Sequence, residues 1–119
     1  MGKASFFNLI DKNPNFFLIA GPCVIESYEN AYMIADSLKV ICNNLDIPLV
    51  FKASFRKANR SSINSFTGIG DEKAIKILAE IKAKLGVSIC TDIHNPIDTE
   101  KLNDVADIIQ IPAFLCRQT

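Results

Sequence analysis

The chain has 119 residues, of which 49% are hydrophobic and 22% are charged, and 13 basic residues balance 13 acidic ones. This composition is typical of a globular chain that buries a core, and it excludes a disordered one. Because the net charge is zero, the chain lacks the field that binders of nucleic acid or anionic membranes use. We therefore expect no nucleic acid and no membrane as a partner, and any anion site has to be local.

The cysteines and the N-terminal segment indicate the compartment. No apolar run approaches the roughly 20 residues that a membrane-spanning helix needs. Polar residues from Asp11 to Asn15 interrupt the N-terminal segment before a secretory core forms, so we expect a cytoplasmic protein. The cysteines show neither zinc-ribbon pairs nor the density of a disulfide scaffold, and we interpret them as reduced thiols. They are Cys23, Cys42, Cys90 and Cys116.

The first half of the chain is predicted to form a strand, a helix and a second strand. Phe16–Ala20 is a wholly apolar run, typical of a strand buried on both faces of a parallel sheet. Ser27 is a suitable N-cap for a helix that ends near Asn44. Ile47–Ala53 repeats the strand signature. The apolar residues of the helix recur on one face, at Ala31, Ile34, Ala35, Leu38, Ile41, Cys42 and Leu45.

The second half repeats this alternation after a long polar loop from Ser54 to Gly70. A helix is expected over Lys73–Leu85, with Gly86 as its terminator, followed by a strand over Val87–Thr91. A weaker helix signal and a last strand come next. They cover Pro96–Asn103 and Asp107–Ile111. The order βαβαβαβ predicts an α/β fold with a parallel sheet and right-handed crossovers.

This pattern fits either a doubly wound sheet or part of a (β/α)8 barrel, and periodicity alone does not separate the two. No linker or charge block divides the chain, so we expect residues 1–119 to form a single domain. Four strands are half of what a barrel needs. An isolated half exposes two strand edges and an apolar inner face, which favours association.

Polar residues gather just after the predicted strands, where α/β folds place their sites. They are Cys23, Glu26, the segment from Lys52 to Ser62, Asp92, His94 and the segment from Gln110 to Gln118. The loop after the second strand is rich in hydrogen-bond donors. It contains Lys52, Ser54, Arg56, Lys57, Asn59, Arg60, Ser61 and Ser62, and no acidic residue. Such a loop suits phosphate or carboxylate groups, although a solvated basic loop explains the composition equally well.

Two further clusters carry weaker signals. Gln110 ends a strand, and after it the N–H of Ala113 and the side chain of Arg117 are suited to bind an anion. The alternative interpretation of this cluster is a polar cap on the last strand. Asp92 is suited to hold a substrate hydroxyl or a proton in transit. His94 suits a ligand or an acid/base role, but a hydrogen-bonded loop histidine is the simplest interpretation.

Cofactor signals are sparse. Cys23 is suited to be a soft metal ligand, but from the residues alone an ordinary buried cysteine is the default. No glycine loop of the P-loop or dinucleotide type occurs, so we expect no nucleotide cofactor.

Four segments together resemble the 3-deoxy-D-manno-octulosonate 8-phosphate synthase family. They are GPCVIES, FKASFRKANRSS, TDIH and IQIPAFLCRQT, and the resemblance spans roughly residues 16–119. KANRSS and IPAFLCRQT distinguish this family from its relatives that make heptulosonate or sialic acid. The resemblance implies that the chain is the N-terminal half, about four βα units, of a (β/α)8 TIM barrel. It also implies a homotetramer and a place in the lipopolysaccharide biosynthesis of Gram-negative bacteria.

The resemblance further implies a reaction and its residues. C3 of phosphoenolpyruvate attacks the aldehyde of arabinose 5-phosphate, water adds at C2, and phosphate leaves with C–O cleavage. The phosphate and carboxylate of phosphoenolpyruvate would be held by Lys52, Ser54, Lys57, Gln110, Ala113 and Arg117. Arabinose 5-phosphate would be met by Asn59, Arg60 and Ser61, and its hydroxyls by Asp92. Lys57, Asn59 and Asp92 are the residues to which a catalytic role would fall.

Cys23 decides the implied subclass. Family members with cysteine at this position are metal-dependent, whereas members with asparagine work without metal. A thiolate suits a divalent transition metal such as Zn, Fe or Mn. The remaining ligands, a His, a Glu and an Asp, would belong to the other half of the barrel.

Three positions depart from the family pattern. Arg56 stands where Asp is usual, Thr67 where Arg is usual, and Ile69 where Pro is usual. Because later phosphate-binding residues and metal ligands lie outside this half, we expect the 119-residue chain alone to be inactive. Two alternatives stay open. One is a non-catalytic half-barrel dimer that binds phosphorylated ligands, and the other is a related heptulosonate-type synthase that uses erythrose 4-phosphate.

Overall fold

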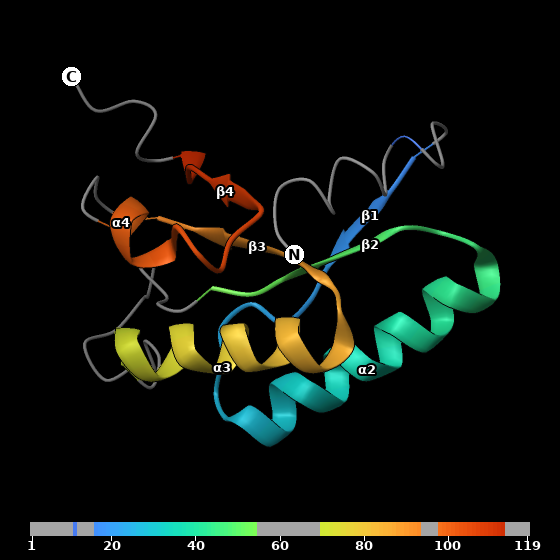
Figure 1. The fold of residues 1–119 in the computed structure, drawn as a ribbon, viewed down its shortest axis with the longest axis horizontal. Helices are drawn as coiled ribbons and strands as arrows, with labels where there is room; N and C mark the ends of the chain where they lie inside the picture. Colours follow the sequence, from blue (N-terminus) through green and yellow to red (C-terminus); the bar gives the residue numbers. More distant parts are fainter. Residues whose placement is uncertain (1–10, 12–15, 55–69, 94–97, 114–119) are drawn as a thin grey trace.

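The computed structural model describes residue 11 and residues 16–54, 70–93 and 98–113, which form one parallel sheet flanked by helices (Figure 1). Strands and helices alternate, which confirms the predicted βαβαβαβ order. The strands are β1 (Leu18–Ala20), β2 (Leu49–Lys52), β3 (Ser88–Asp92) and β4 (Ile108–Gln110). The helices are α2 (Tyr28–Leu45), α3 (Asp71–Leu85) and α4 (Asp98–Leu102).

The strand order resolves the choice that the sequence left open. The sheet runs β1-β2-β3-β4, and each strand pairs in parallel with the next one along the chain. A doubly wound sheet reverses its strand order at a switch point, whereas a barrel adds its strands consecutively. The described strands therefore form an α/β fold consistent with part of a TIM barrel.

The ends of the two long helices follow the sequence signals. The Ser27 hydroxyl accepts a hydrogen bond from the Asn30 N–H at 3.1 Å and caps α2. Gly86 ends α3 with a φ of 67°, a left-handed conformation that glycine adopts without strain. α3 begins two residues before the predicted Lys73, and α4 ends at Leu102, one residue before the predicted Asn103. The first residues predicted for that helix lie outside the described ranges.

The helices α2 and α3 cover one face of the sheet and build the main core with it (Figure 1). Alternate residues of β2 and β3 point into this core, as a strand period of two requires. The largest core side chains are Phe51, Ile25, Leu78, Ile81, Ile89 and Leu102. No helix in the described ranges is long and apolar enough to cross a membrane.

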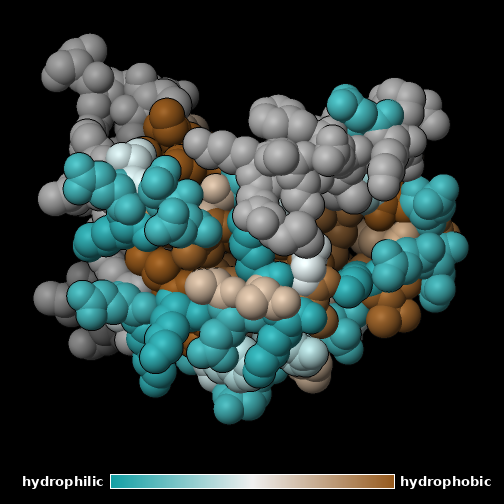
Figure 2. All heavy atoms as spheres, viewed as in Figure 1, coloured by the Kyte–Doolittle hydropathy of each residue, from teal (hydrophilic) through white to brown (hydrophobic). Residues whose placement is uncertain are grey.

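Among the described residues, the opposite face carries a small apolar cluster, in which Phe17 and Ile108 pack against the buried Val50 and Cys90. The prediction of a first strand buried on both faces is wrong here. Ile19 is 41% exposed and Phe16, just before β1, is 58% exposed, because β1 is an edge strand. Figure 2 shows further apolar surface beside β4 and around the C-terminal end of α2.

The C-terminal half of α2 also departs from the predicted apolar face. Ala31, Ala35 and Cys42 are buried as expected, but Ile41 and Leu45 are exposed, Leu45 by 62%. Both stand in the C-terminal turns of α2, the helix that leads into β2. The described residues therefore do not fully cover the C-terminal end of α2.

Candidate functional site

The candidate site lies where β2, β3 and β4 end. Lys52, Asp92 and Gln110 are the last residues of these three strands. The register places Lys52 opposite Cys90, and Asp92 opposite Gln110. Because side chains alternate across a strand, these residues share the face that carries Val50, away from the helices. In a barrel this face lines the interior below the C-terminal rim.

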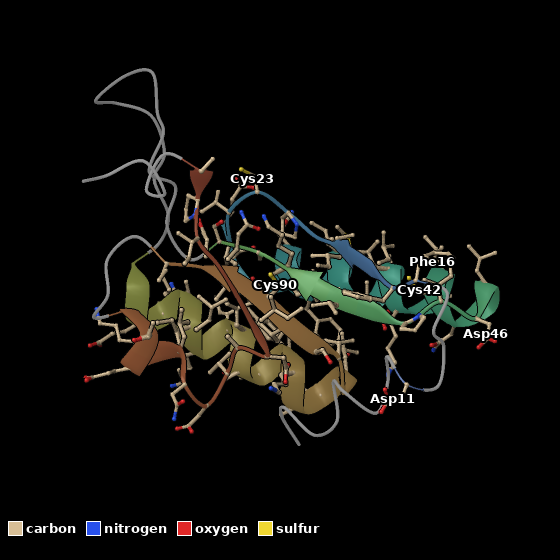
Figure 3. All side chains as sticks on the ribbon, turned by 90° about the horizontal axis from the view of Figure 1, so that it is seen from above. Asp11, Phe16, Cys23, Cys42, Asp46 and Cys90 are labelled. Carbon is tan, nitrogen blue, oxygen red and sulfur yellow. The ribbon has the colours of Figure 1, made fainter. Side chains whose placement is uncertain are left out.

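The loop after β1 is held against the end of β2. Val24 and Ser54 form a parallel bridge, and the Ile25 N–H donates to the Ser54 carbonyl at 3.0 Å. A Cβ atom added to Gly21 would lie 1.8 Å from the Lys52 carbonyl oxygen, so only glycine fits at this close approach. These contacts bring Cys23, exposed on the loop that follows β1 (Figure 3), to the rim at which β2 ends.

The rim combines buried and accessible groups. Asp92 and Ser54 are buried, Lys52 is partly buried and Gln110 is exposed. Burial raises the pKa of the Cys90 thiol; the positive charge of Lys52 opposes this shift and the negative charge of Asp92 reinforces it. A cation and a carboxylate therefore flank a protonated thiol on the open face. This arrangement offers a cationic donor to an anion and an acceptor to a hydroxyl.

The structure brings together only part of the site predicted from the sequence. Cys23, Lys52, Ser54, Asp92 and Gln110 gather at the rim, and Ala113 follows β4 three residues after its end. The other predicted residues lie outside the described ranges. They are Lys57, Asn59, Arg60, Ser61 and Arg117, with His94 and the three departures Arg56, Thr67 and Ile69.

Two residues of the site escaped the sequence analysis. Cys90 stands two positions before Asp92, so the strand period that places Asp92 on the open face also places Cys90 there. Gly21 follows the first strand, where a glycine is compatible with a close backbone approach as well as with a turn. The period of β3 and the glycine at the end of β1 were the available signals.

A metal is not held by the described residues alone. Among them no group of three or more His, Cys, Asp or Glu side chains is close enough to bind one. Cys23 is a single soft donor at the rim, and one donor does not define a metal site.

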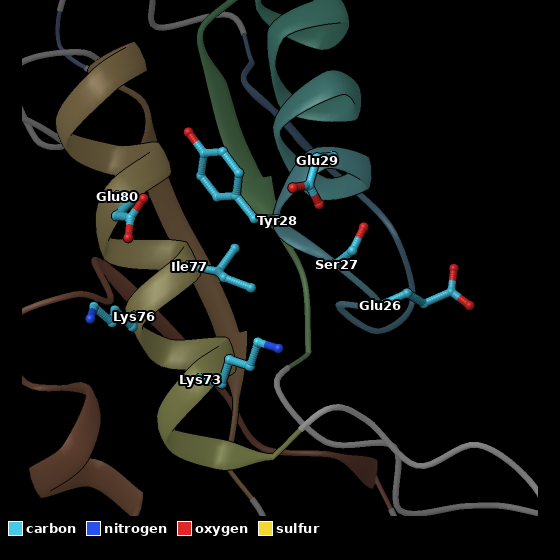
Figure 4. Close-up of a pocket in the computed structure, with 8 residues that line it drawn as sticks. All are labelled: Glu26, Ser27, Tyr28, Glu29, Lys73, Lys76, Ile77 and Glu80. Carbon is cyan, nitrogen blue, oxygen red and sulfur yellow. The ribbon is translucent and has the colours of Figure 1, made fainter.

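A separate cavity of about 390 Å³ lies between α2 and α3 (Figure 4). Glu26 and Glu29 line it from the N-terminal end of α2, and Lys73, Lys76 and Glu80 line it from α3. Glu26, which the sequence placed among the polar residues after the strands, lines this cavity, whereas none of the residues predicted to bind substrate or metal does. It opens on the helix-covered side, whereas Lys52, Asp92 and Gln110 share the other face.

A consecutively ordered parallel sheet with its polar residues at the carboxyl ends of the strands defines this chain as part of a TIM-barrel type of enzyme scaffold. The family model described as the DAHP synthetase I family matches residues 7–119. The chain belongs to this family.

Curated relatives agree with this assignment. The chain is 52% identical over 103 residues to the 2-dehydro-3-deoxyphosphooctonate aldolase of Thiobacillus denitrificans, covering 87% of this chain and 37% of that protein. The aldolase of the same name from Legionella pneumophila is 52% identical, with 87% and 38% covered. That of Bordetella petrii is 50% identical over 117 residues, with 98% and 41% covered. The chain thus spans about two fifths of the length of these relatives.

Proposed function

We propose that residues 1–119 form the β1–β4 part of a synthase that condenses phosphoenolpyruvate with arabinose 5-phosphate. The products are 3-deoxy-D-manno-octulosonate 8-phosphate, a lipopolysaccharide precursor, and phosphate. The observation that carries this proposal is the placement of Lys52, Asp92 and Gln110 on one open face at the strand ends. It is supported by the 52% identity to relatives named 2-dehydro-3-deoxyphosphooctonate aldolase.

Phosphoenolpyruvate is a compact trianion, so its site needs cations and neutral donors. Lys52 at the end of β2 and Gln110 at the end of β4 supply one of each on either side of β3, and Ser54 follows Lys52 by two residues. A cation in a water-poor site stabilises charge on the phosphate and carboxylate far more than it does in water. The proposed set is completed by the Ala113 N–H and by Lys57 and Arg117.

The second substrate is an aldehyde with several hydroxyls and a phosphate. Asp92 is a buried carboxylate at the end of β3 and is suited to accept hydrogen bonds from the sugar hydroxyls. Asn59, Arg60 and Ser61 are proposed to bind its phosphate end. C3 of the enol phosphate then attacks the aldehyde, water adds at C2, and the C–O bond to phosphate breaks. Positioning the two substrates accounts for most of the catalysis.

Cys23 is proposed as the one metal ligand that this segment contributes. A bound divalent metal would orient or activate the aldehyde or water. The test uses a chimera that joins residues 1–119 to the remaining part of the Legionella pneumophila relative and that is loaded with Co²⁺ as the divalent metal. In this chimera, Cys23→Ser should abolish the thiolate-to-cobalt charge-transfer absorption. Cys42→Ser, on the helix side of the sheet, should leave it intact. A charge-transfer band that survives Cys23→Ser would contradict the assignment.

The proposed assembly and location rest on the family resemblance and on the sequence. We propose a homo-oligomer, a tetramer in the complete enzyme, that acts in the cytoplasm. We also propose that the 119-residue chain alone does not turn over substrate, because it spans only about two fifths of its relatives.

The same chimera tests the proposed function directly. Phosphate release from phosphoenolpyruvate should depend on arabinose 5-phosphate, and Lys52→Met should lower kcat/KM by about 100-fold. Lys76→Met, an exposed lysine of α3, is the matched control and should change kcat/KM by less than about twofold. Turnover supported by erythrose 4-phosphate instead would favour the heptulosonate-type alternative. A folded chimera without turnover on either sugar would refute the proposal.

A further inference from the structure

A buried carboxylate stands at the opposite end of β4 from the candidate site. Asp107 immediately precedes β4, and its side chain is only 1% exposed. Its Oδ2 accepts a hydrogen bond from the Ile89 N–H at 2.8 Å, while its own backbone N–H donates to the Ile89 carbonyl at 2.8 Å. Asp107 thus binds both backbone groups of a single residue of β3.

Lys82 of α3 completes this contact from the helix layer beneath the sheet (Figure 1). Its Nζ lies 3.0 Å from Asp107 Oδ2 and also donates to the Val105 carbonyl at 3.0 Å. The side chain of Lys82 is 14% exposed, so the ion pair is largely removed from water. The three residues tie α3, β3 and the turn before β4 to one point.

The ion pair between Lys82 and Asp107 adds little to the stability of the fold, although it is buried. Burying two charges costs several kcal/mol, and their attraction often does no more than offset that cost. Asp107 Oδ1 adds to the cost, because it is buried and has no hydrogen-bond partner among the described residues. The gain from Asp107 is therefore one of geometry, and the geometry it fixes is the pairing of β4.

The register of β4 needs such a device. β4 has three residues and, among the described strands, pairs only with β3, so few ladder bonds specify the pairing. With Asp107 bound to Ile89, the following pairs place Asp92 opposite Gln110, and the Ile93 N–H donates to the Gln110 carbonyl at 3.1 Å. A slip by one residue would turn the Gln110 side chain to the helix side of the sheet.

We propose that Asp107 is a positioning residue that sets the register of β4 and so holds Gln110 beside Asp92 at the substrate site. Its effect on substrate rests on the proposed function, whereas its effect on the register does not. Within the contact, the Oδ2 bond to the Ile89 N–H fixes the register, and Lys82 neutralises the buried charge.

Amide hydrogen exchange in the full 119-residue chain tests the register. The Ile93 amide is the readout, because it bonds to Gln110 at the far end of the β3–β4 pair from Asp107. Asp107→Leu should lower its protection by at least about tenfold while α2 keeps its protection. Asp107→Asn keeps an oxygen for the Ile89 N–H and should retain Ile93 protection within about threefold, although it loses the charge.

The double variant Lys82→Met/Asp107→Leu separates register from stability. Replacing both charges by apolar groups should restore a melting temperature close to that of the unchanged chain. Ile93 protection should nevertheless stay low, because the bond to the Ile89 N–H is still missing. Protection that follows the melting temperature across the three variants, or Asp107→Asn losing as much protection as Asp107→Leu, would overturn the proposal.

The chimera with the Legionella pneumophila relative then tests the effect on substrate. Asp107→Leu should raise KM for phosphoenolpyruvate by about tenfold and leave KM for arabinose 5-phosphate unchanged, with recovery in Asp107→Asn. An unchanged KM for phosphoenolpyruvate alongside lost Ile93 protection would overturn the positioning role. If the unsubstituted chimera is inactive, the proposed function fails, and the exchange experiment still decides the register.

Discussion

At the scale of single residues, Gly21 marks a close backbone approach beside the candidate site. A Cβ there would meet the Lys52 carbonyl oxygen at 1.8 Å, and backbone atoms have no alternative rotamer to adopt. Gly21→Ala should therefore push the end of β1 away from β2 and lower the free energy of unfolding by about 3 kcal/mol. Urea unfolding measures this loss.

Gly86→Ala is the matched control for that substitution. A Cβ at Gly86 meets nothing within 4 Å, and only its φ of 67° opposes a side chain. Its cost should be about 1 kcal/mol. Equal losses in the free energy of unfolding for the two variants would show that the close approach of Gly21 to Lys52 does not constrain how the end of β1 packs against β2.

The buried thiols predict how stability depends on pH. Burial raises the pKa of Cys42 above its ordinary value of 9.0, and burial also raises the pKa of Cys90 against the opposing charge of Lys52. The folded chain then keeps these protons to a higher pH than the unfolded chain does. This contribution to stability is complete below the unfolded pKa and is lost as the pH rises through the folded values.

Urea unfolding at about pH 7 and about pH 10 checks that sign. The unchanged chain should lose more stability between the two pH values than Cys42→Ala/Cys90→Ala does. Ile81→Val makes a small core cavity without removing a thiol, and its loss should be the same at both pH values. A double variant with the full pH dependence of the unchanged chain would contradict the prediction.

At the scale of elements, the N-cap of α2 is a single side-chain bond whose contribution is measurable. Ser27→Ala removes the acceptor for the Asn30 N–H and should cost about 1 kcal/mol in the free energy of unfolding. Ser37→Ala, at an exposed position inside the same helix, replaces serine by a better helix former and should stabilise slightly. A loss of stability in Ser37→Ala as large as that in Ser27→Ala would contradict the assignment of Ser27 as the N-cap of α2.

The helices were more predictable than the strands because their signals are local. The Ser27 cap and the Gly86 terminator are written in adjacent residues, and both ends agree with the structure. The burial of β1 depends instead on what lies beside it in the sheet. Phe16–Ala20 has the composition of a central strand, but the exposure of Ile19 reflects an edge position that no local pattern records.

At the scale of the whole molecule, the candidate site was predictable only as a location. Parallel strands bring their carboxyl ends to one edge, so Lys52, Asp92 and Gln110 had to lie near one another in either parallel fold. The order of the strands was not predictable from periodicity, because doubly wound sheets and barrels use the same alternation. The close approach at Gly21 and the contact of Asp107 with Ile89 depend on backbone distances between separate segments.

The incomplete covering of the sheet predicts how the 119-residue chain behaves in solution. Large apolar side chains are exposed at both edges, among them Ile19 at β1 and Ile109 at β4. Among the described strands, β1 pairs only with β2 and β4 only with β3, so each has one side without a neighbouring strand. We expect self-association, with a mass that rises with concentration in sizing chromatography with light scattering. Ile19→Lys/Ile109→Lys should lower that mass, because a charge at an edge opposes further pairing.

The matched control is Val40→Lys, which places the same charge on an exposed apolar position of α2 away from the strand edges. It should leave the concentration dependence unchanged. A monomer at every concentration would contradict the prediction. A discrete dimer whose melting temperature rises with phosphate would instead favour the non-catalytic half-barrel, because two four-stranded sheets supply the eight strands of a closed barrel. A mass that grows without a fixed stoichiometry would mean that the strand edges of different chains pair without closing a barrel. This is the expected result if further barrel strands normally cover these edges.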